Sequence, residues 1–573
     1  MKIFIYKSGA KRRKDRPQPQ FLPLLLVFLG FTFLLTIFFP SPHGQASLSA
    51  NQLGHKELAA KTIYKNLDNK TSINKPVNRG QQASLKASPE EVPPPSPASD
   101  ASRLKLNSTA RLSDELDKLR RRLTSLINHQ RLRRTHFSIA IRWAQTEEMI
   151  FEHQAHTPLV PASNMKLVTT IAAIHRLGVD FEYVTRVALS SNSLLIIGSG
   201  DPLLGDKEID KRTGRKPYWL LEDLTARLQA RGISSLEDII LDTSIFGPER
   251  VHPQWPPNAR LQKYACEVSG LNYNNNCVEI SVANRQGKTV LFLEPKTAYL
   301  RLINATTAVS SKENWFSVER TTSPRVLRVT GKINTQAGPY AVAIENPALF
   351  LGTLIKEQLA KKGVMVTGEV REESLPADQN YELVAEYRTP LLEVLRRANK
   401  DSLGLAAEAL IKTLGAWENP EHKGGTWEAG RNAVARFLTT ELGIPEEEFM
   451  IADGSGLSRE NRLTANALSS LLSWVHRQPF WPEFETTMAV GGVDGTLENV
   501  FRERALRGRV VAKTGYINGV RALSGITHTR QGDIIFSFLA NNASNLARST
   551  INNIVKEITY WADTLNLSPS LSN

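Results

Sequence analysis

Two residues near position 165 have the types and spacing that serine acyl transfer requires. Ser163 and Lys166 stand three positions apart, after Pro161 and at the start of an apolar run that favours a buried helix. Residues at i and i+3 share one helix face, so their side chains can meet. A serine hydroxyl is a weak nucleophile until a base takes its proton, and a lysine with a depressed pKa can be that base. Alone, the spacing is common, and a solvated lysine near a helix-capping serine is the simpler interpretation.

A second group lies some 350 residues further on, at Lys513-Thr514-Gly515. It follows an apolar stretch (509–512) that predicts a strand, and the stretches 522–526 and 534–539 predict two more strands of an antiparallel meander. Glycine inside a strand often marks close approach of a ligand, and the neighbouring lysine and threonine can hold a carboxylate. Ser-x-x-Lys at a helix start together with Lys-Thr-Gly on a late edge strand is typical of serine enzymes that bind penicillin.

With both groups in place, the chain resembles the class C low-molecular-mass penicillin-binding proteins, the D-alanyl-D-alanine carboxypeptidase/endopeptidases. The resemblance runs from about Leu112 to Asn542. It implies an α/β (α+β) fold: a penicillin-binding, β-lactamase-like core of an antiparallel sheet and helices, interrupted by a large, mostly β insertion. The matched stretches occur in the family's order: 161–170, 198–202, 269–278, 453–459, 492–497 and 513–515.

The family's third motif is altered here. The resemblance implies Ser-x-Asn ahead of an Ala-Glu pair, and the matching stretch keeps Ser402 but has Gly404 in place of the asparagine. In the family, that amide contacts the substrate and helps to order the lysine. One lost hydrogen bond is worth roughly 0.5–1.5 kcal/mol, so we expect a rate or affinity loss of about tenfold and not a dead enzyme.

The remaining roles are those that the resemblance implies. The expected catalytic residues are Ser163, Lys166 and Ser402. The residues expected to bind substrate are Lys513, Thr514, Gly515 and Gly404. Backbone N–H groups of Ser163 and Tyr516 are expected to stabilise the oxyanion, since any residue but proline can donate there. Tyr516 replaces the family's small hydroxyl residue, which favours either altered substrate ends or a ring that points aside. No metal or cofactor is expected.

The implied function is a serine-type D-Ala-D-Ala carboxypeptidase, with endopeptidase activity open, that acts on peptidoglycan peptides and is inhibited by β-lactams. Three alternatives remain: a β-lactamase, which shares the core; a weakened penicillin-binding pseudoenzyme, motivated by Gly404 and Tyr516; and a structural protein tethered to the wall. The large insertion argues against the β-lactamase.

The amino-terminal part predicts export. Residues 1–20 are strongly basic, and 21–39 form a run of 19 residues without a charge, long enough to span a bilayer. The positive-inside rule places 1–20 in the cytoplasm and the rest in the bacterial envelope, on the periplasmic side. The run is longer than a usual signal core, which favours a membrane anchor over a signal peptide cleaved near Gly44-Gln45-Ala46. Residues 40–110, rich in polar residues and proline, predict a flexible tether.

The rest of the chain divides into 111–184 and 385–573, the two parts of the catalytic domain, and 185–384, which the family makes inserted domains. A helix is predicted from Leu112 with Ser113 as its N-cap, followed by strands at 137–143 and 149–151. Ser455, between glycines, does not fit a nucleophile elbow and is interpreted as a turn.

Composition limits the other partners. The net charge of +14 comes partly from the first twenty residues, and no nucleic-acid motif accompanies it, so no nucleic-acid partner is expected. Cys266 and Cys277 have no zinc-ligand spacing; a disulfide and two buried thiols both stay open. His153 and His156 lack a third ligand and are more typical of surface or packed residues.

Overall fold

The computed structural model describes residues 98–376, 378–419 and 421–565, with side-chain surroundings from Leu112 onward. The predicted anchor at 21–39 and the predicted tether up to residue 97 lie outside these ranges. No helix in the described part of the chain is long and apolar enough to cross a membrane.

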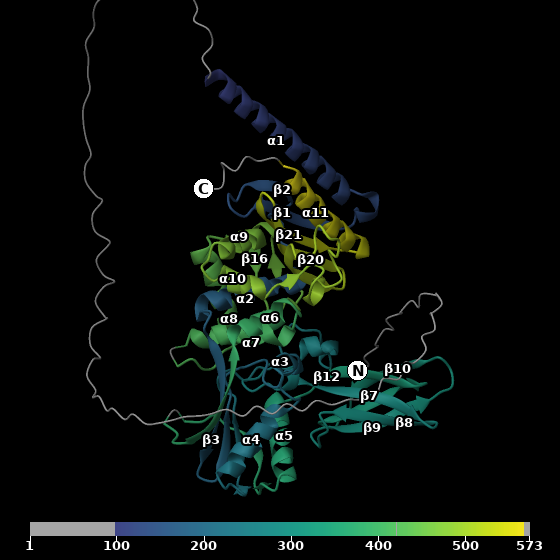
Figure 1. Cartoon of the computed structure of the whole chain (residues 1–573). Coiled ribbons are helices and arrows are strands. Elements are labelled where there is room, and N and C mark those ends of the chain that lie inside the picture. The colour runs from purple at the N-terminus through teal and green to yellow at the C-terminus, as the bar shows by residue number, and fades with distance from the viewer. Residues whose placement is uncertain (1–97, 377, 420, 566–573) are drawn as a thin grey trace, which may run out of the picture. The chain divides into compact units, whose positions relative to one another are not determined.

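A six-stranded antiparallel sheet carries the two predicted groups (Figure 1). Its order is β18-β19-β20-β21-β1-β2, and the strands alternate apolar side chains between two covered faces. The bounds are β18 (Ala489–Val490), β19 (Val510–Ile517), β20 (Val520–Thr529), β21 (Gly532–Asn541), β1 (His136–Trp143) and β2 (Met149–His153). The predicted strands at 137–143, 149–151, 509–512, 522–526 and 534–539 are therefore confirmed.

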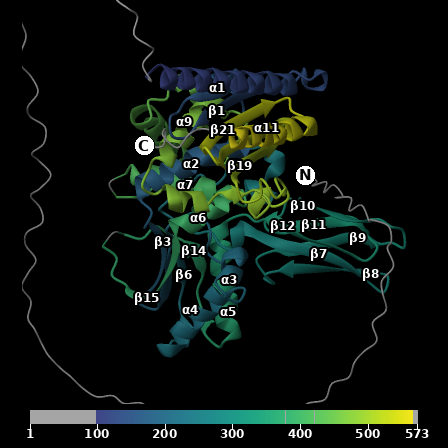
Figure 2. The ribbon, with the colours of Figure 1, turned by 45° about the horizontal axis from the view of Figure 1, so that its top comes forward.

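Helices cover both faces of this sheet (Figure 2). On one face α1 (Ala98–Ile127) and α11 (Asn545–Thr564) pack over Phe536, Phe538 and Leu523. The other face, with Ile535 and Leu539, meets a helical layer. That layer contains α2 (Met165–Leu177), α6 (Leu391–Asn399), α7 (Gly404–Trp417), α8 (Trp427–Arg436), α9 (Ala465–His476) and α10 (Trp481–Thr486).

Between α2 and α6 the chain builds a second hydrophobic core. A five-stranded sheet, in the order β14-β6-β4-β3-β15, and two three-stranded sheets, β12-β7-β8 and β10-β11-β9, make up most of it. The strands are β3 (Glu182–Ser190), β4 (Ser193–Ile197), β6 (Ile239–Asp242), β7 (Cys277–Arg285), β8 (Lys288–Glu294), β9 (Arg301–Ala308), β10 (Asn314–Arg320), β11 (Val326–Ile333), β12 (Gln336–Ala343), β14 (Val370–Glu372) and β15 (Glu382–Pro390). The helices are α3 (Lys207–Arg212), α4 (Trp219–Ala230) and α5 (Pro347–Lys361).

Two short strand pairs complete the strands of the described residues: β5 (Ser235–Leu236) with β13 (Met365–Val366), and β16 (Phe449–Met450) with β17 (Arg462–Leu463).

The prediction that Ser113 caps the first helix is wrong. The helix α1 begins at Ala98, directly after Pro97, and Ser113 lies in its middle. After Pro97 there is no proline or glycine until well beyond Ile127, so nothing stops the helix from extending towards the amino terminus. The end of the predicted tether, from Ala98 to residue 110, is accordingly helical.

Candidate functional site

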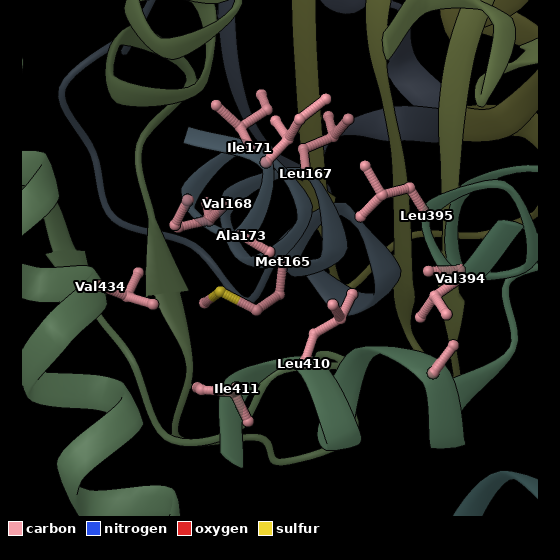
Figure 3. Close-up of a cluster of buried hydrophobic side chains, with 14 of the residues drawn as sticks. Met165, Leu167, Val168, Ile171, Ala173, Val394, Leu395, Leu410, Ile411 and Val434 are labelled. Atoms are coloured by element: carbon pink, nitrogen blue, oxygen red, sulfur yellow. The ribbon is translucent and has the colours of Figure 1, made fainter. Parts of the chain in front are cut away.

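The helix α2 is the element that fixes the first pair of residues. Its side chains Met165, Leu167, Val168 and Ile171 are almost fully buried, and Figure 3 shows them gathered with Leu410 and Ile411 of α7 and their neighbours. Burial on this scale ties the start of α2 to the helical layer, because each large apolar side chain contributes roughly 1.5–3 kcal/mol when removed from water.

Ser163 precedes α2 in a single turn of 3₁₀ helix, η2 (Ala162–Asn164). Lys166 is the second residue of α2, so Ser163 and Lys166 lie one turn apart across the junction of the two helices. The Lys166 ammonium donates to Ser163 Oγ at 3.2 Å, and to the carbonyl oxygen of Ser455 at 2.7 Å. The predicted meeting of the two side chains is confirmed.

Lys166 is only 2% exposed. Burial lowers the pKa of its amine to about 8, although the negative charges of Glu408 and Asp453 oppose the change. A lysine with this pKa has a substantial neutral fraction near neutral pH and can accept a proton.

The loop after β16 holds Lys166 in place. The Glu408 carboxylate, on α7, accepts from the backbone N–H groups of Gly454 (3.1 Å) and Ser455 (2.8 Å) and from the Trp427 indole (2.8 Å). Burial, followed by the nearby Asp453 charge, raises the pKa of Glu408 to about 7. The loop that Glu408 anchors presents the Ser455 carbonyl to the lysine, so the predicted turn at Ser455 has a structural task in the site.

Gly456 brings this loop against the nucleophile's turn. Its φ is +81°, and a Cβ on it would lie 1.8 Å from the carbonyl oxygen of Ala162. Only glycine permits both that conformation and that approach. The backbone next to Ser163 and the backbone that holds Lys166 are thus in direct contact.

Lys513 and Ser402 form the opposite side of the site. The Lys513 ammonium donates to Ser402 Oγ at 3.0 Å and to the Thr514 carbonyl at 2.9 Å. Burial, and next the positive charge of Lys166, hold the pKa of Lys513 well below its usual value. Burial lowers the pKa of both lysines, and the repulsion between their two charges disfavours the state in which both are protonated.

A buried ion pair positions Ser402. The Arg397 guanidinium donates to the Asp206 carboxylate at 2.8 Å, and both side chains are nearly inaccessible to solvent. The Arg397 guanidinium also donates to the Asp401 carboxylate, and the Arg397 carbonyl accepts from the backbone N–H of Leu403. The loop therefore closes around Ser402, whose φ is +58°. Because Asp206 precedes α3, the second core takes part in shaping this loop.

The amide of Asn164 links η2 to the Lys-Thr-Gly strand. With its nitrogen towards β19, an orientation that follows from the surrounding bonds, it donates to the Lys513 carbonyl at 3.0 Å and accepts from Ser524 Oγ at 2.7 Å. Gly515 lies beside this link, since a Cβ there would come within 2.9 Å of the Pro161 carbonyl.

Gly404 begins α7 directly beside the second core. A Cβ on it would lie 3.1 Å from the carbonyl oxygen of Tyr264, in η4 (Lys263–Ala265). The space for a larger side chain is therefore partly taken by backbone. The Lys166 amine is held by the Ser455 carbonyl, a contact that does not involve Gly404.

Thr514 and Tyr516 face away from Lys513, because side chains alternate along a strand. Thr514 Oγ1 donates to Thr496 Oγ1 at 2.9 Å. The Tyr516 ring is 67% exposed and lies 4.2 Å from the Arg521 guanidinium. Whether this ring alters which substrate ends are accepted stays a prediction. β18 pairs only with Val511 and Ala512, so β19 has no neighbouring strand from Lys513 onward on that side within the described residues.

The other residues singled out from the sequence lie outside this arrangement. Cys266 and Cys277 are both buried free thiols, and burial raises the pKa of each. His156 bonds the Glu448 carboxylate, and partial burial lowers the pKa of His153.

Three polar residues of the site were given no role from the sequence: Glu408, Asp453 and Asn164. A signal was present for Glu408, which is the lone acid in the apolar stretch 403–411 and therefore needs buried partners. Asp453 accepts from the N–H groups of Gly456 and Ser458, a contact that only the folded loop shows.

A sheet covered on both faces, with a Ser-Lys pair at the start of α2 and Lys-Thr-Gly on β19, defines a penicillin-binding fold. The crystal structure of penicillin-binding protein 4 from Haemophilus influenzae has the same fold, with a TM-score of 0.64 and 22% identity over 76% of this chain and 98% of that chain.

The sequence profile of the D-Ala-D-Ala carboxypeptidase 3 (S13) family matches residues 119–565, and the chain belongs to this family. The D-alanyl-D-alanine carboxypeptidase of Actinomadura sp. (strain R39) is 30% identical over 468 residues, which are 77% of this chain and 84% of that relative. The D-alanyl-D-alanine carboxypeptidase DacB of H. influenzae is 26% identical over 402 residues, 67% of this chain and 81% of that protein.

Proposed function

We propose that this protein is a serine-type D-Ala-D-Ala carboxypeptidase that acts on peptidoglycan peptides through an acyl-enzyme. The observation that carries the proposal is the 3.2 Å contact between the Lys166 amine and Ser163 Oγ, at a lysine whose pKa burial lowers to about 8. Membership of the S13 family and the carboxypeptidase relatives support the choice of substrate.

In the proposed first step, Lys166 takes the Ser163 proton as Ser163 Oγ attacks the carbonyl carbon between two D-alanines. The N–H groups of Ser163 and Tyr516 stabilise the oxyanion. Ser402 passes a proton to the leaving amine and receives in turn the proton that Lys166 took, so the bond between the amine and the carbonyl carbon breaks and D-alanine departs. Lys166, neutral again, takes a proton from a water that attacks the ester and returns it to Ser163 Oγ as the ester bond breaks, which releases the shortened peptide.

The proposed carboxylate-binding group consists of Lys513, Thr514 and Gly515. It lies beside Gly404, at the start of α7. The low pKa of free Lys513 fits this role, because an arriving carboxylate brings the negative charge that favours the ammonium form.

The test is release of D-alanine from a pentapeptide muropeptide, together with labelling by a fluorescent penicillin. The wild-type protein is expected to do both, and Ser163→Ala to do neither. A matched control is Ser549→Ala, an exposed serine on α11. Labelling without D-alanine release indicates the weakened penicillin-binding protein, and rapid loss of the label indicates a β-lactamase. Absence of labelling at Ser163 contradicts the proposal.

The inhibitor class is proposed on the same grounds, since the H. influenzae penicillin-binding protein 4 has also been crystallised with a β-lactam. We further propose that the protein works in the bacterial envelope, on the periplasmic side, anchored by residues 21–39. Carbonate extraction of membranes checks the anchor, and recovery of a soluble chain that begins near Ala46 would show a cleaved signal peptide.

A further inference from the structure

The helix α7 carries a buried lysine that no step of the proposed reaction uses. Lys412 is 0% exposed and lies one helical turn after Glu408, on the same face of the helix. An ammonium group removed from water needs other groups around it to stay charged. The contacts of Lys412 therefore decide whether α7 holds a positive charge next to Glu408.

Those contacts favour the ammonium form. Lys412 Nζ donates to the carbonyl oxygens of Glu249 at 2.7 Å and Gly247 at 3.5 Å. It also lies 5.1 Å from the centre of the Phe246 ring and 4.5 Å from that of the Trp427 ring. Carbonyl oxygens and aromatic faces both attract a cation. Burial lowers the pKa of Lys412 to about 8 and the Glu249 charge opposes the change, so the ammonium form still predominates at neutral pH.

The inserted part of the chain supplies three of these four contacts. Residues 246–249 follow β6 and belong to the insertion between α2 and α6. Their position is fixed, because the N–H of Gly247 donates to the Gly425 carbonyl at 3.0 Å and the N–H of Gly425 donates to the Ile245 carbonyl at 2.9 Å. Gly425 in turn lies against α7, since a Cβ on it would come within 2.2 Å of the Lys412 carbonyl oxygen. The surroundings of the ammonium are therefore held in place by backbone contacts.

Trp427 connects this ammonium to the support of the proposed base. The indole ring that lies beside Lys412 donates through its N–H to the Glu408 carboxylate at 2.8 Å. Glu408 is 1% exposed and accepts from the backbone N–H of Ser455, whose carbonyl accepts from Lys166. Direct contacts therefore run without a break from the inserted segment to the base.

The charges around Glu408 show when the Lys412 ammonium matters. Asp453, on the neighbouring loop, opposes ionisation of Glu408, and Lys166, on α2, favours it while protonated. The proposed reaction requires Lys166 in its neutral form, which contributes no charge. Lys412 keeps a positive charge near Glu408 at that moment, and the Glu408 charge stabilises the ammonium in return. The positive charge of Arg250, on the inserted segment, acts against the ammonium.

We propose that Lys412 is a positioning residue: its charge keeps Glu408 ionised while Lys166 is neutral. Residues 246–249 of the insertion take part in the reaction by holding this ammonium. The inference rests on the proposed function, because Glu408 matters to the reaction through Lys166. Lys412 is too deeply buried to touch substrate and acts through the carboxylate that fixes the Ser455 carbonyl.

The rate of labelling by a fluorescent penicillin, followed across pH, tests this role in the full chain. Lys412→Met removes the charge and keeps most of the length of the side chain. Without that charge the pKa of Glu408, which burial already raises to about 7, rises further, so Glu408 is protonated at neutral pH. A neutral carboxyl forms weaker hydrogen bonds to the loop than a carboxylate does. Labelling is expected to be about tenfold slower at neutral pH and to need a higher pH to recover.

Two further variants separate the charge of Lys412 from its packing. Lys361→Met makes the same replacement at an exposed position, the end of α5, and is expected to label at the wild-type rate. In Glu408→Gln no carboxylate remains for Lys412 to act on. Adding Lys412→Met to that variant is expected to change the rate by less than about twofold and to leave its pH dependence in place. The double variant lacks both buried charges and should be more stable than Lys412→Met alone.

Equal slowing by Lys412→Met in the wild-type and Glu408→Gln proteins would overturn the proposal, because the lysine would then act through packing alone. An unchanged rate and pH dependence in Lys412→Met would overturn it as well. If Lys412→Met does not fold, the double variant should fold, and its failure to do so contradicts the link between the two charges. If penicillin does not label the wild-type protein, the proposed function fails, and additive effects of the two substitutions on the unfolding midpoint would then also refute the link.

Discussion

Substituting Gly456 by alanine tests whether the loop of residues 453–456 positions the Ser163–Lys166 pair. The added Cβ would lie 1.8 Å from the Ala162 carbonyl oxygen, so one of the two backbones must move. Either movement disturbs the pair, because Ala162 adjoins Ser163 and the neighbouring Ser455 carbonyl accepts from Lys166 at 2.7 Å.

The expected free-energy cost of Gly456→Ala has two parts. An L-residue at φ +81° costs roughly 1–2 kcal/mol by itself. Loss of the Lys166–Ser455 bond, whose donor is charged, is worth about 1.5–3 kcal/mol. A change of this size in the placement of the base corresponds to roughly tenfold or more in the acylation rate. We therefore expect Gly456→Ala to lower the unfolding midpoint and to slow labelling by penicillin at least tenfold.

Gly508→Ala is the matched control. Gly508 has the same φ of +81°, but nothing lies within 4 Å of the position of its Cβ. It should lose only the conformational part of the stability and acylate at the wild-type rate. Stopped-flow labelling and chemical unfolding measure both effects. If the two variants behave alike in labelling, close contact between the loop and the nucleophile's turn does not position the pair.

Three further predictions concern the lysine, the third motif and the buried ion pair. Labelling should rise with pH as the Lys166 amine, with a pKa of about 8, loses its proton, and a rate that falls across this range would contradict its role as base. Gly404→Asn should not speed D-alanine release, because the Tyr264 carbonyl crowds its Cβ; a tenfold gain (about 1.4 kcal/mol) would show that the missing amide limits the enzyme. Asp206→Asn should destabilise the fold by up to about 3–5 kcal/mol, measured by chemical unfolding, because the buried Arg397 guanidinium keeps only the more exposed Asp401 as a charged partner.

Asp238→Asn supplies the control for the ion pair. Asp238 pairs with Arg371 at the surface, where solvent screens the two charges, so the loss of stability should be much smaller than in Asp206→Asn. A comparable loss of stability in both variants would mean that burial of the Arg397–Asp206 pair is not what makes it important.

Local sequence patterns predicted which helices and strands form better than they predicted where each one begins and ends. The strands β1, β19, β20 and β21 follow from short apolar stretches, and the start of α2 follows from Pro161. The predicted start of α1 was wrong. Ser113 has the properties of an N-cap residue, but a helix continues through such a residue when no proline or glycine interrupts it. Propensity ranks residues at helix ends but does not decide where a long helix begins.

The spacing in the sequence predicted that Ser163 and Lys166 meet, and the motifs indicated Lys513 and Ser402. The contacts that hold these side chains in place could not be predicted from the sequence. The support of Lys166 by the Ser455 carbonyl depends on a main-chain atom nearly 300 residues away, and main-chain atoms have no signature in a sequence. The crowding of Gly404 by Tyr264 likewise depends on how the second core packs on α7. The departure at Gly404 could be seen from the sequence, and the carbonyl that lies against it could not.

The central claim, that Ser163 is acylated with Lys166 as its base, is tested most directly by mass spectrometry of the intact protein after brief exposure to benzylpenicillin. The account predicts one added penicilloyl group, located by peptide mapping on Ser163, and no addition in Ser163→Ala or Lys166→Ala. An adduct on another serine, or full and equally rapid acylation in Lys166→Ala, would contradict it.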